Sequence, residues 1–228
     1  MIPLRDENPT TLTPVVTVAL IILNCLVYLY QVSLGPAEEG FITSFAAVPA
    51  EWFRPGTVVG DARVPPALTV LTSMFLHGSV MHLGGNMLYL WIFGNNIEDV
   101  MGHGRFVVFY LLCGAAAMFS HAVTAPDSTV PMIGASGAIS GVLGAYLLLF
   151  PRARVLVLIP LGFFTRLVYV PALVVLGFWI VMQVISGAFS WGGLGGGVAW
   201  FAHVGGFAAG LALIKVFQRR PVASTLRW

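Results

Sequence analysis

The sequence predicts an all-α membrane protein, a compact bundle of six transmembrane helices with both termini in the cytoplasm. Apolar residues make up 58% of the 228 residues and charged residues only 9%, a composition typical of an integral membrane protein. Six apolar runs are long enough to cross a bilayer at 1.5 Å per residue. Lys and Arg are concentrated in alternate connections between these runs, which fixes the orientation.

The chain is expected to form one domain, residues 14–218, between an N-terminal cytoplasmic tail, 1–13, and a C-terminal cytoplasmic tail, 219–228. The six spans are expected at about 14–32, 80–97, 106–123, 134–150, 167–189 and 198–217. The first two are separated by a long loop, 34–78, in which 67–76 has the pattern of a short interfacial helix. The glycine-rich stretch 190–197 before the last span has the composition of a hinge.

Orientation follows from the count of Lys and Arg in each connection. With the N-terminus in the cytoplasm, two basic residues lie outside, Arg54 and Arg63. The other nine lie inside, and they are Arg5, Arg105, Arg152, Arg154, Arg166, Lys215, Arg219, Arg220 and Arg227. This asymmetry obeys the positive-inside rule and predicts cytoplasmic termini.

Composition also bounds the partners. The net charge of +2 is too small to indicate a nucleic-acid partner, so the expected partners are the lipid bilayer and other membrane proteins. Cys25 and Cys113 both fall inside apolar runs, where a thiol behaves as a small hydrophobe, and two isolated cysteines form no metal site. We expect neither a metal nor an organic cofactor.

A serine lies between glycines where the fourth span begins. The stretch 133–141 reads Ile-Gly-Ala-Ser-Gly-Ala-Ile-Ser-Gly and contains Ser136. Its small residues, Gly137 and Gly141 among them, also have the spacing that lets two membrane helices approach closely. For this stretch alone, helix packing is the favoured interpretation.

Polar residues on two other spans favour a catalytic role for Ser136 over a role in helix packing alone. Spans two, four and six all enter from the outer face, so His82, Asn86, Ser136 and His203, near their starts, are expected at one depth. Polar side chains in membrane helices face the protein interior or a water-filled cavity. A serine needs a base such as His203 to take its proton, and His82 and Asn86, on one helix face, can donate to an oxyanion with the backbone N–H of Ser136. The alternative role for Asn86 is to join two helices by hydrogen bonds, and His77, His103 and His121 are expected to reach interfacial water.

Together these motifs resemble the rhomboid intramembrane serine proteases. The resemblance rests on Gly-Ala-Ser-Gly at 134–137, Ala-His-x-Gly-Gly at 202–206 and His-x-x-x-Asn at 82–86. It implies a rhomboid-like six-helix bundle, with Ser136 as nucleophile, His203 as general base, and His82, Asn86 and the Ser136 N–H as oxyanion donors. It further implies space for the substrate backbone at Gly134 and packing roles for three glycines, Gly137, Gly206 and Gly210.

The chain departs from the family pattern at one position of the site. Many members place an aromatic residue four positions after the nucleophile, where it stacks on the catalytic histidine, whereas this chain has Ser140. The base is therefore expected to be oriented differently or less firmly.

The sequence thus predicts a serine endopeptidase that uses a Ser-His dyad. It is expected to cleave transmembrane proteins at, or just inside, the boundary between the membrane and the water on its outer side. A non-catalytic rhomboid-like protein that binds membrane clients is one alternative. A transporter or channel is the other, although no paired interior charges or repeats support it. The N-terminal region carries Asp6 and Glu7, unlike an acid-poor transit peptide, so a cell (plasma) membrane location is expected.

Overall fold

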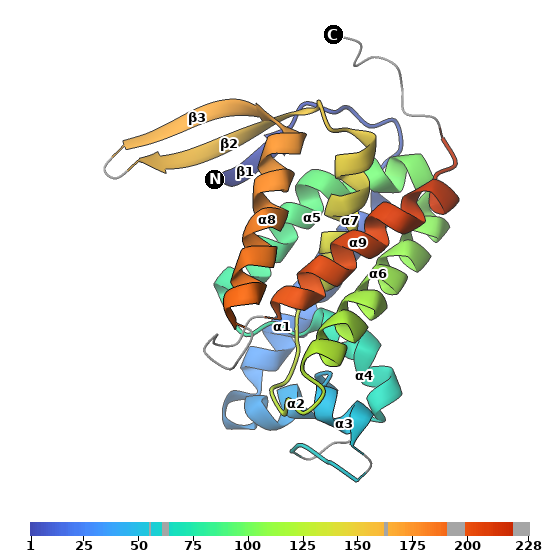
Figure 1. Ribbon diagram of the computed structural model, residues 1–228, viewed down its shortest axis with the longest axis vertical. Helices are drawn as coiled ribbons and strands as arrows, with labels where there is room; N and C mark the ends of the chain where they lie inside the picture. The colour runs from blue at the N-terminus through green and yellow to red at the C-terminus, as the bar shows by residue number, and fades with distance from the viewer. Residues whose placement is uncertain (55, 61–63, 162–163, 191–198, 221–228) are drawn as a thin grey trace.

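The computed structural model describes all residues except 55, 61–63, 162–163, 191–198 and 221–228, and it is mostly helical (Figure 1). The long helices are α1 (Val15–Ser33), α5 (Val80–Met101), α6 (His103–Thr124), α7 (Ser136–Leu149), α8 (Ala172–Ser190) and α9 (Trp200–Phe217). The first loop contains the short helices η1 (Gly35–Ala37), α2 (Glu38–Phe45), α3 (Pro49–Phe53), α4 (Pro66–Thr72) and η2 (Ser73–Phe75). The described residues also include three strands, β1 (Ile2–Asp6), β2 (Arg154–Leu161) and β3 (Phe164–Pro171).

Four of the described helices, α1, α6, α8 and α9, are long and apolar enough to cross a membrane. A fifth candidate is α5 together with α4 and η2, which meet it at a bend of 83°. Helix α7 is apolar but has only 14 residues, so it is about 21 Å long, shorter than the ~30 Å hydrocarbon core. The stretch 67–76 is helical, as expected, and forms α4 and η2.

Helix α7 lies at the centre of the bundle, between α5, α6 and α9 (Figure 1). Every residue from Gly137 to Tyr146 is buried. Around its C-terminal end lies a cluster of buried aromatic side chains, in which Tyr146 packs against Phe93 and Phe150. A helix that is apolar on all sides is stable only when neighbours surround it, and this position accounts for its composition.

The expectation of an all-α protein is wrong at one end of the bundle. The three strands form an antiparallel sheet in the order β1-β2-β3, with Val155 opposite Val170 and Val157 opposite Val168. Strand β1 lies within the expected N-terminal tail, 1–13, and pairs with β2. The fifth helix starts at Ala172 rather than near 167. The β-branched and aromatic residues before Pro171 favour a strand once a partner strand is available.

Two acidic residues at the C-terminal end of α5 bind residues near both ends of the described chain. The buried Glu98 carboxylate accepts from the backbone N–H groups of Val16 and Thr17 at 2.9 and 2.7 Å and from the Thr17 hydroxyl at 2.7 Å. Asp99 accepts from the N–H of Thr11 and from Arg220. Glu98 thus supplies acceptors for the first N–H groups of α1, which have no partner within the helix.

The glycine-rich stretch expected to act as a hinge, 190–197, falls almost entirely outside the described residues, and most of the C-terminal tail, 219–228, does as well.

Candidate active site

Ser136 is the first residue of α7, and the backbone before it is shaped for close contacts. Gly134 has φ +118°, a conformation that L side chains rarely adopt. A Cβ at this glycine would lie 2.7 Å from Nε2 of His82 and 3.6 Å from Nδ2 of Asn86. The chain therefore passes directly beside these two side chains just before it turns into the helix at Ser136.

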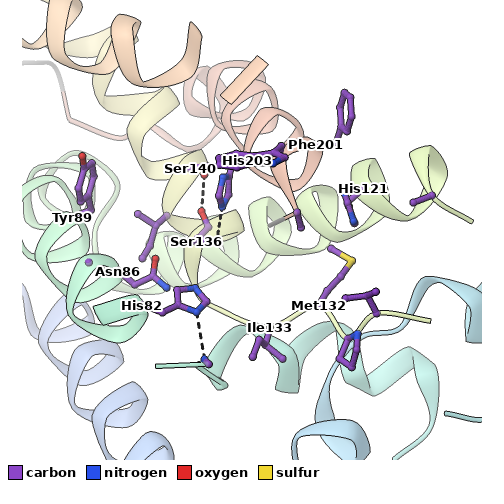
Figure 2. Close-up of a pocket in the computed structure, with 18 of the residues that line it drawn as sticks. His82, Asn86, Tyr89, His121, Met132, Ile133, Ser136, Ser140, Phe201 and His203 are labelled. Atoms are coloured by element: carbon purple, nitrogen blue, oxygen red, sulfur yellow. Dashed lines mark hydrogen bonds between the residues drawn. The ribbon is translucent and has the colours of Figure 1, made fainter. Parts of the chain in front are cut away.

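The structure brings Ser136 and His203 together. Nε2 of His203, on α9, lies 2.8 Å from Oγ of Ser136 (Figure 2). Both side chains are partly buried. This separation is within the range for a serine hydroxyl that donates to an imidazole nitrogen, the arrangement in which a base activates a serine nucleophile.

Glycines allow the two helices that carry this pair to touch through their backbones. A Cβ on Gly206 of α9 would overlap the carbonyl oxygen of Gly137 on α7, and one on Gly210 would overlap that of Gly141. Gly137 itself faces α6, since a Cβ there would lie 2.6 Å from Cβ of Ala117. The contact at Gly206 and Gly137 is adjacent to both reactive side chains, so helix packing directly determines their separation.

His82 and Asn86 reach the site from α5 (Figure 2). Nδ1 of His82 accepts the backbone N–H of Gly78 at 3.4 Å, so in the neutral ring Nε2 carries the proton, and Nε2 is the atom that faces Gly134. His82 is thereby set up as a donor and not as a base. The Nδ2 group of Asn86 lies 2.9 Å from Nε2 of His77, which uses one of its two N–H bonds and leaves the second for another acceptor.

Of the other histidines, His77 differs from the expectation that it reaches interfacial water. His77 is fully buried, and its backbone carbonyl accepts from Nε2 of Gln31 at 2.7 Å. Its ring holds Asn86. His103 contacts the buried carboxylate of Glu98 at 2.6 Å, and His121 lines the cavity beside the reactive pair. A buried His77 five residues before His82 was not recognisable as part of the site, because one histidine in an apolar context has no specific pattern.

Two contacts from α8 were missed by the sequence reasoning. Oε1 of Gln183 lies 2.7 Å from Nδ1 of His203, and the ring of Trp179 lies over His203 at 5.8 Å between centroids, with the planes at 40°. Ser140 does not cover the histidine, because its hydroxyl donates to the backbone carbonyl of Ser136 at 2.6 Å. The histidine ring is therefore oriented by α8, since α7 has a serine and not an aromatic residue at position 140.

A cavity of about 790 Å³ opens beside these side chains (Figure 2). Its lining includes His82, Asn86, Ser136 and His203, and it extends along the connection that contains Val130 and neighbouring residues. A second cavity of about 50 Å³ lies on another side of Ser136, among Met118, Ala202 and other small or apolar residues. Within the described part of the chain, no three His, Cys, Asp or Glu side chains form a group that could hold a metal.

Comparison with known proteins identifies the family. Residues 66–220 match the model of the Rhomboid domain. The chain is 30% identical over 220 residues to the rhomboid protease GluP of Bacillus subtilis, covering 93% of this chain and 38% of GluP. It is 31% identical over 159 residues to the mitochondrial presenilin-associated rhomboid-like protein A of Danio rerio, which covers 68% of this chain and 37% of that protein.

A third relative, the mitochondrial rhomboid protein 1 of Saccharomyces cerevisiae, is 37% identical over 100 residues, or 42% of this chain and 29% of the yeast protein. The chain thus spans less than two fifths of the length of each of these three relatives. The Rhomboid match covers the helices that carry His82, Ser136, Gln183 and His203. The chain therefore belongs to the rhomboid family.

Proposed function

We propose that this chain is an intramembrane serine endopeptidase that cleaves transmembrane proteins with Ser136 and His203. The observation that carries the proposal is the 2.8 Å contact between Ser136 Oγ and His203 Nε2, facing a cavity large enough for an extended peptide. Membership of the rhomboid family, which includes a relative named as a protease, supports the same function.

In the proposed reaction, Ser136 Oγ attacks the scissile carbonyl carbon while His203 Nε2 takes the hydroxyl proton. The carbonyl oxygen becomes an oxyanion, and it accepts hydrogen bonds from Nε2–H of His82, Nδ2–H of Asn86 and the backbone N–H of Ser136. When the tetrahedral intermediate collapses, the carbon–nitrogen bond breaks and His203 gives its proton to the leaving amine. Water then hydrolyses the resulting Ser136 ester by the same steps, with His203 again as base and then as acid.

The short central helix explains how hydrolysis can occur inside a membrane protein. Ser136 is at the N-terminal end of α7, which is about 21 Å long and is enclosed by longer helices. Because α7 is shorter than its neighbours α5, α6 and α9, the space beyond Ser136 is left to the cavity of about 790 Å³. Backbone that is not helical is tolerated at membrane depth where it lines a water-filled cavity, and residues 131–135 have this role.

The substrate we propose is a transmembrane segment with a small residue before the cleaved bond. The cavity of about 50 Å³ beside Ser136 is lined largely by small residues such as Ala117, Gly137 and Ala202, which supports a small substrate side chain at this position. A helical substrate keeps its carbonyl groups in hydrogen bonds, so residues that weaken its helix are needed near the cut. No metal or organic cofactor enters this chemistry.

We propose that the chain crosses the membrane six times, by α1, α5, α6, α7, α8 and α9, with both termini in the cytoplasm. The six long helices and the excess of Lys and Arg at one end of the bundle support this topology. We place the protein in a cell (plasma) membrane. The relatives in mitochondria make an internal membrane the competing location.

Reconstitution tests the proposal. Purified protein in liposomes is mixed with a reporter that carries one transmembrane segment with an alanine near its outer boundary, and products are identified by mass spectrometry. We expect one cut within or beside the segment, and no product with Ser136→Ala or His203→Ala. Cleavage that persists in Ser136→Ala would overturn the assignment. A wild-type protein that binds the reporter without cutting it would favour the client-binding alternative.

A further inference from the structure

We propose that Gln183 is a positioning residue for His203, so that the reactive unit is Ser136, His203 and a neutral amide acceptor and not a two-residue dyad. The proposal rests on the proposed proteolytic function and deepens it. Its basis is that both ring nitrogens of His203 are engaged, Nε2 with Ser136 Oγ at 2.8 Å and Nδ1 with Gln183 Oε1 at 2.7 Å.

The two hydrogen bonds of the Gln183 side chain determine which way its amide points. Its Nε2 donates to the backbone carbonyl of Trp179 at 3.3 Å. If the amide were rotated by 180°, its oxygen would face that carbonyl oxygen, and two acceptors would meet without a proton between them. The observed orientation is the one that satisfies both contacts, and it leaves Oε1 facing His203.

An amide oxygen can only accept, so Nδ1 of His203 must carry the ring proton. In a neutral imidazole the other nitrogen, Nε2, then has a free lone pair, and this is the nitrogen beside Ser136 Oγ. Gln183 therefore selects the tautomer that can take the serine proton. In the opposite tautomer Nε2 would carry hydrogen and could not act as a base.

The buried, aromatic environment of Gln183 favours a neutral amide over a carboxylate as the group that orients His203. Gln183 is 8% exposed on α8, and the rings of Trp179 and Trp200 lie 5.8 and 6.3 Å from the His203 ring. A permanent negative charge among these aromatic groups would be costly to bury. A neutral acceptor fixes the ring without that cost, and its carbonyl dipole still favours the imidazolium that forms during the reaction.

The test compares the wild type with two variants. Gln183→Met is close in size to glutamine but has no strong hydrogen-bond acceptor, whereas Gln183→Glu keeps an oxygen in position to accept from Nδ1 of His203. Val184→Met places the same new side chain on the next position of α8, where Val184 is exposed, and serves as the control. Two properties are measured in detergent micelles: the rate at which a fluorophosphonate labels Ser136, and the ring tautomer of His203 by 15N NMR of protein with labelled histidine. Thermal unfolding confirms that each variant is folded.

We expect Gln183→Met to label about ten- to a hundredfold more slowly than the wild type, because small misplacements of a base have effects of this size. Its His203 spectrum should lose the pure Nδ1–H signature, while Gln183→Glu should recover most of the rate and Val184→Met should match the wild type. With a peptide substrate the loss should appear in kcat and leave KM within about twofold. A packing role alone would not alter the tautomer.

The proposal is overturned if folded Gln183→Met keeps the wild-type labelling rate, or if His203 in the wild type is protonated on Nε2. It is also overturned if folded Gln183→Glu labels as slowly as Gln183→Met. A wild-type protein that reacts with no fluorophosphonate would count against the proposed function, and the NMR tautomer would still decide the role of Gln183.

Discussion

The contact between α7 and α9 sets the distance between the two reactive side chains, and the substitution Gly206→Ala tests this directly. An added Cβ would lie 3.1 Å from the carbonyl carbon of Gly137 and 3.3 Å from Cβ of Ala117, and it would overlap the carbonyl oxygen of Gly137. No flexible side chain can relieve the overlap with backbone, so the helices must separate by about 1 Å to restore ordinary contact distances. Ser136 is next to Gly137, and His203 lies three residues before Gly206, so the separation is passed to the reactive pair.

The expected size of the effect follows from that separation. The 2.8 Å distance between Ser136 Oγ and His203 Nε2 would rise to about 3.8 Å, beyond hydrogen-bonding range. We therefore expect the fluorophosphonate labelling rate to fall about a hundredfold and the free energy of unfolding to fall by about 1–3 kcal/mol.

Gly177→Ala is the matched control. A Cβ at Gly177, inside α8, meets no atom within 4 Å, so this variant should keep the wild-type rate and be slightly more stable, as alanine is favoured over glycine in a helix by up to about 1 kcal/mol. A Gly206→Ala protein with wild-type labelling and wild-type unfolding would refute the reasoning about the helix contact.

Three further predictions follow from individual side chains. His82→Ala or Asn86→Ala should lower kcat about 10²- to 10³-fold with little change in KM, and a loss below threefold would argue against their role as oxyanion donors. Glu98→Gln should lower the free energy of unfolding by about 2–4 kcal/mol, because one oxygen that accepts from α1 or His103 becomes a donor; the exposed Glu39→Gln should be neutral in the same thermal melt. Burial raises the pKa of Asp6 in β1 from 3.8 to about 6. The stability contributed by its neutral form is therefore complete below about pH 4 and is lost as the pH rises through 6. Hydrogen exchange of the β1 amides, corrected for intrinsic rate, should be faster at pH 7 than at pH 5 and independent of pH in Asp6→Asn.

Much of the site could be predicted because its residues occur in recognisable local patterns on helices. The small residues around Ser136 and the Gly-Gly that follows His203 mark two helices that approach closely, and the expected crossings of the membrane predict that residues near the starts of alternate helices lie at one depth. These patterns depend only on neighbours in sequence, so one chain was sufficient to predict that Ser136 and His203 meet.

Gln183 could not be predicted in this way. A single glutamine in an apolar run has no motif, and its role depends on the rotation of α8 about its own axis, which places Oε1 at His203 while residues beside it face outward. His77 was missed for the same reason, since its contact with Asn86 depends on the bend between η2 and α5.

The sheet was missed because its strands have no alternation of polar and apolar residues. Residues 155–161 are all apolar, and an apolar run of this length is equally consistent with a strand or a piece of helix. Pairing decides between strand and helix, since β2 pairs with β3 along one edge and with β1, which is distant in sequence, along the other. Such long-range pairing is not visible in any local window of sequence.

The central claim is that the imidazole of His203 activates the hydroxyl of Ser136. Its most direct test is the site of modification by a fluorophosphonate, mapped by tandem mass spectrometry on the wild-type protein and on His203→Ala. We predict one adduct, on Ser136, in the wild type and none in His203→Ala after the same exposure. An adduct on another residue, or equal labelling of Ser136 in the absence of His203, would contradict the account.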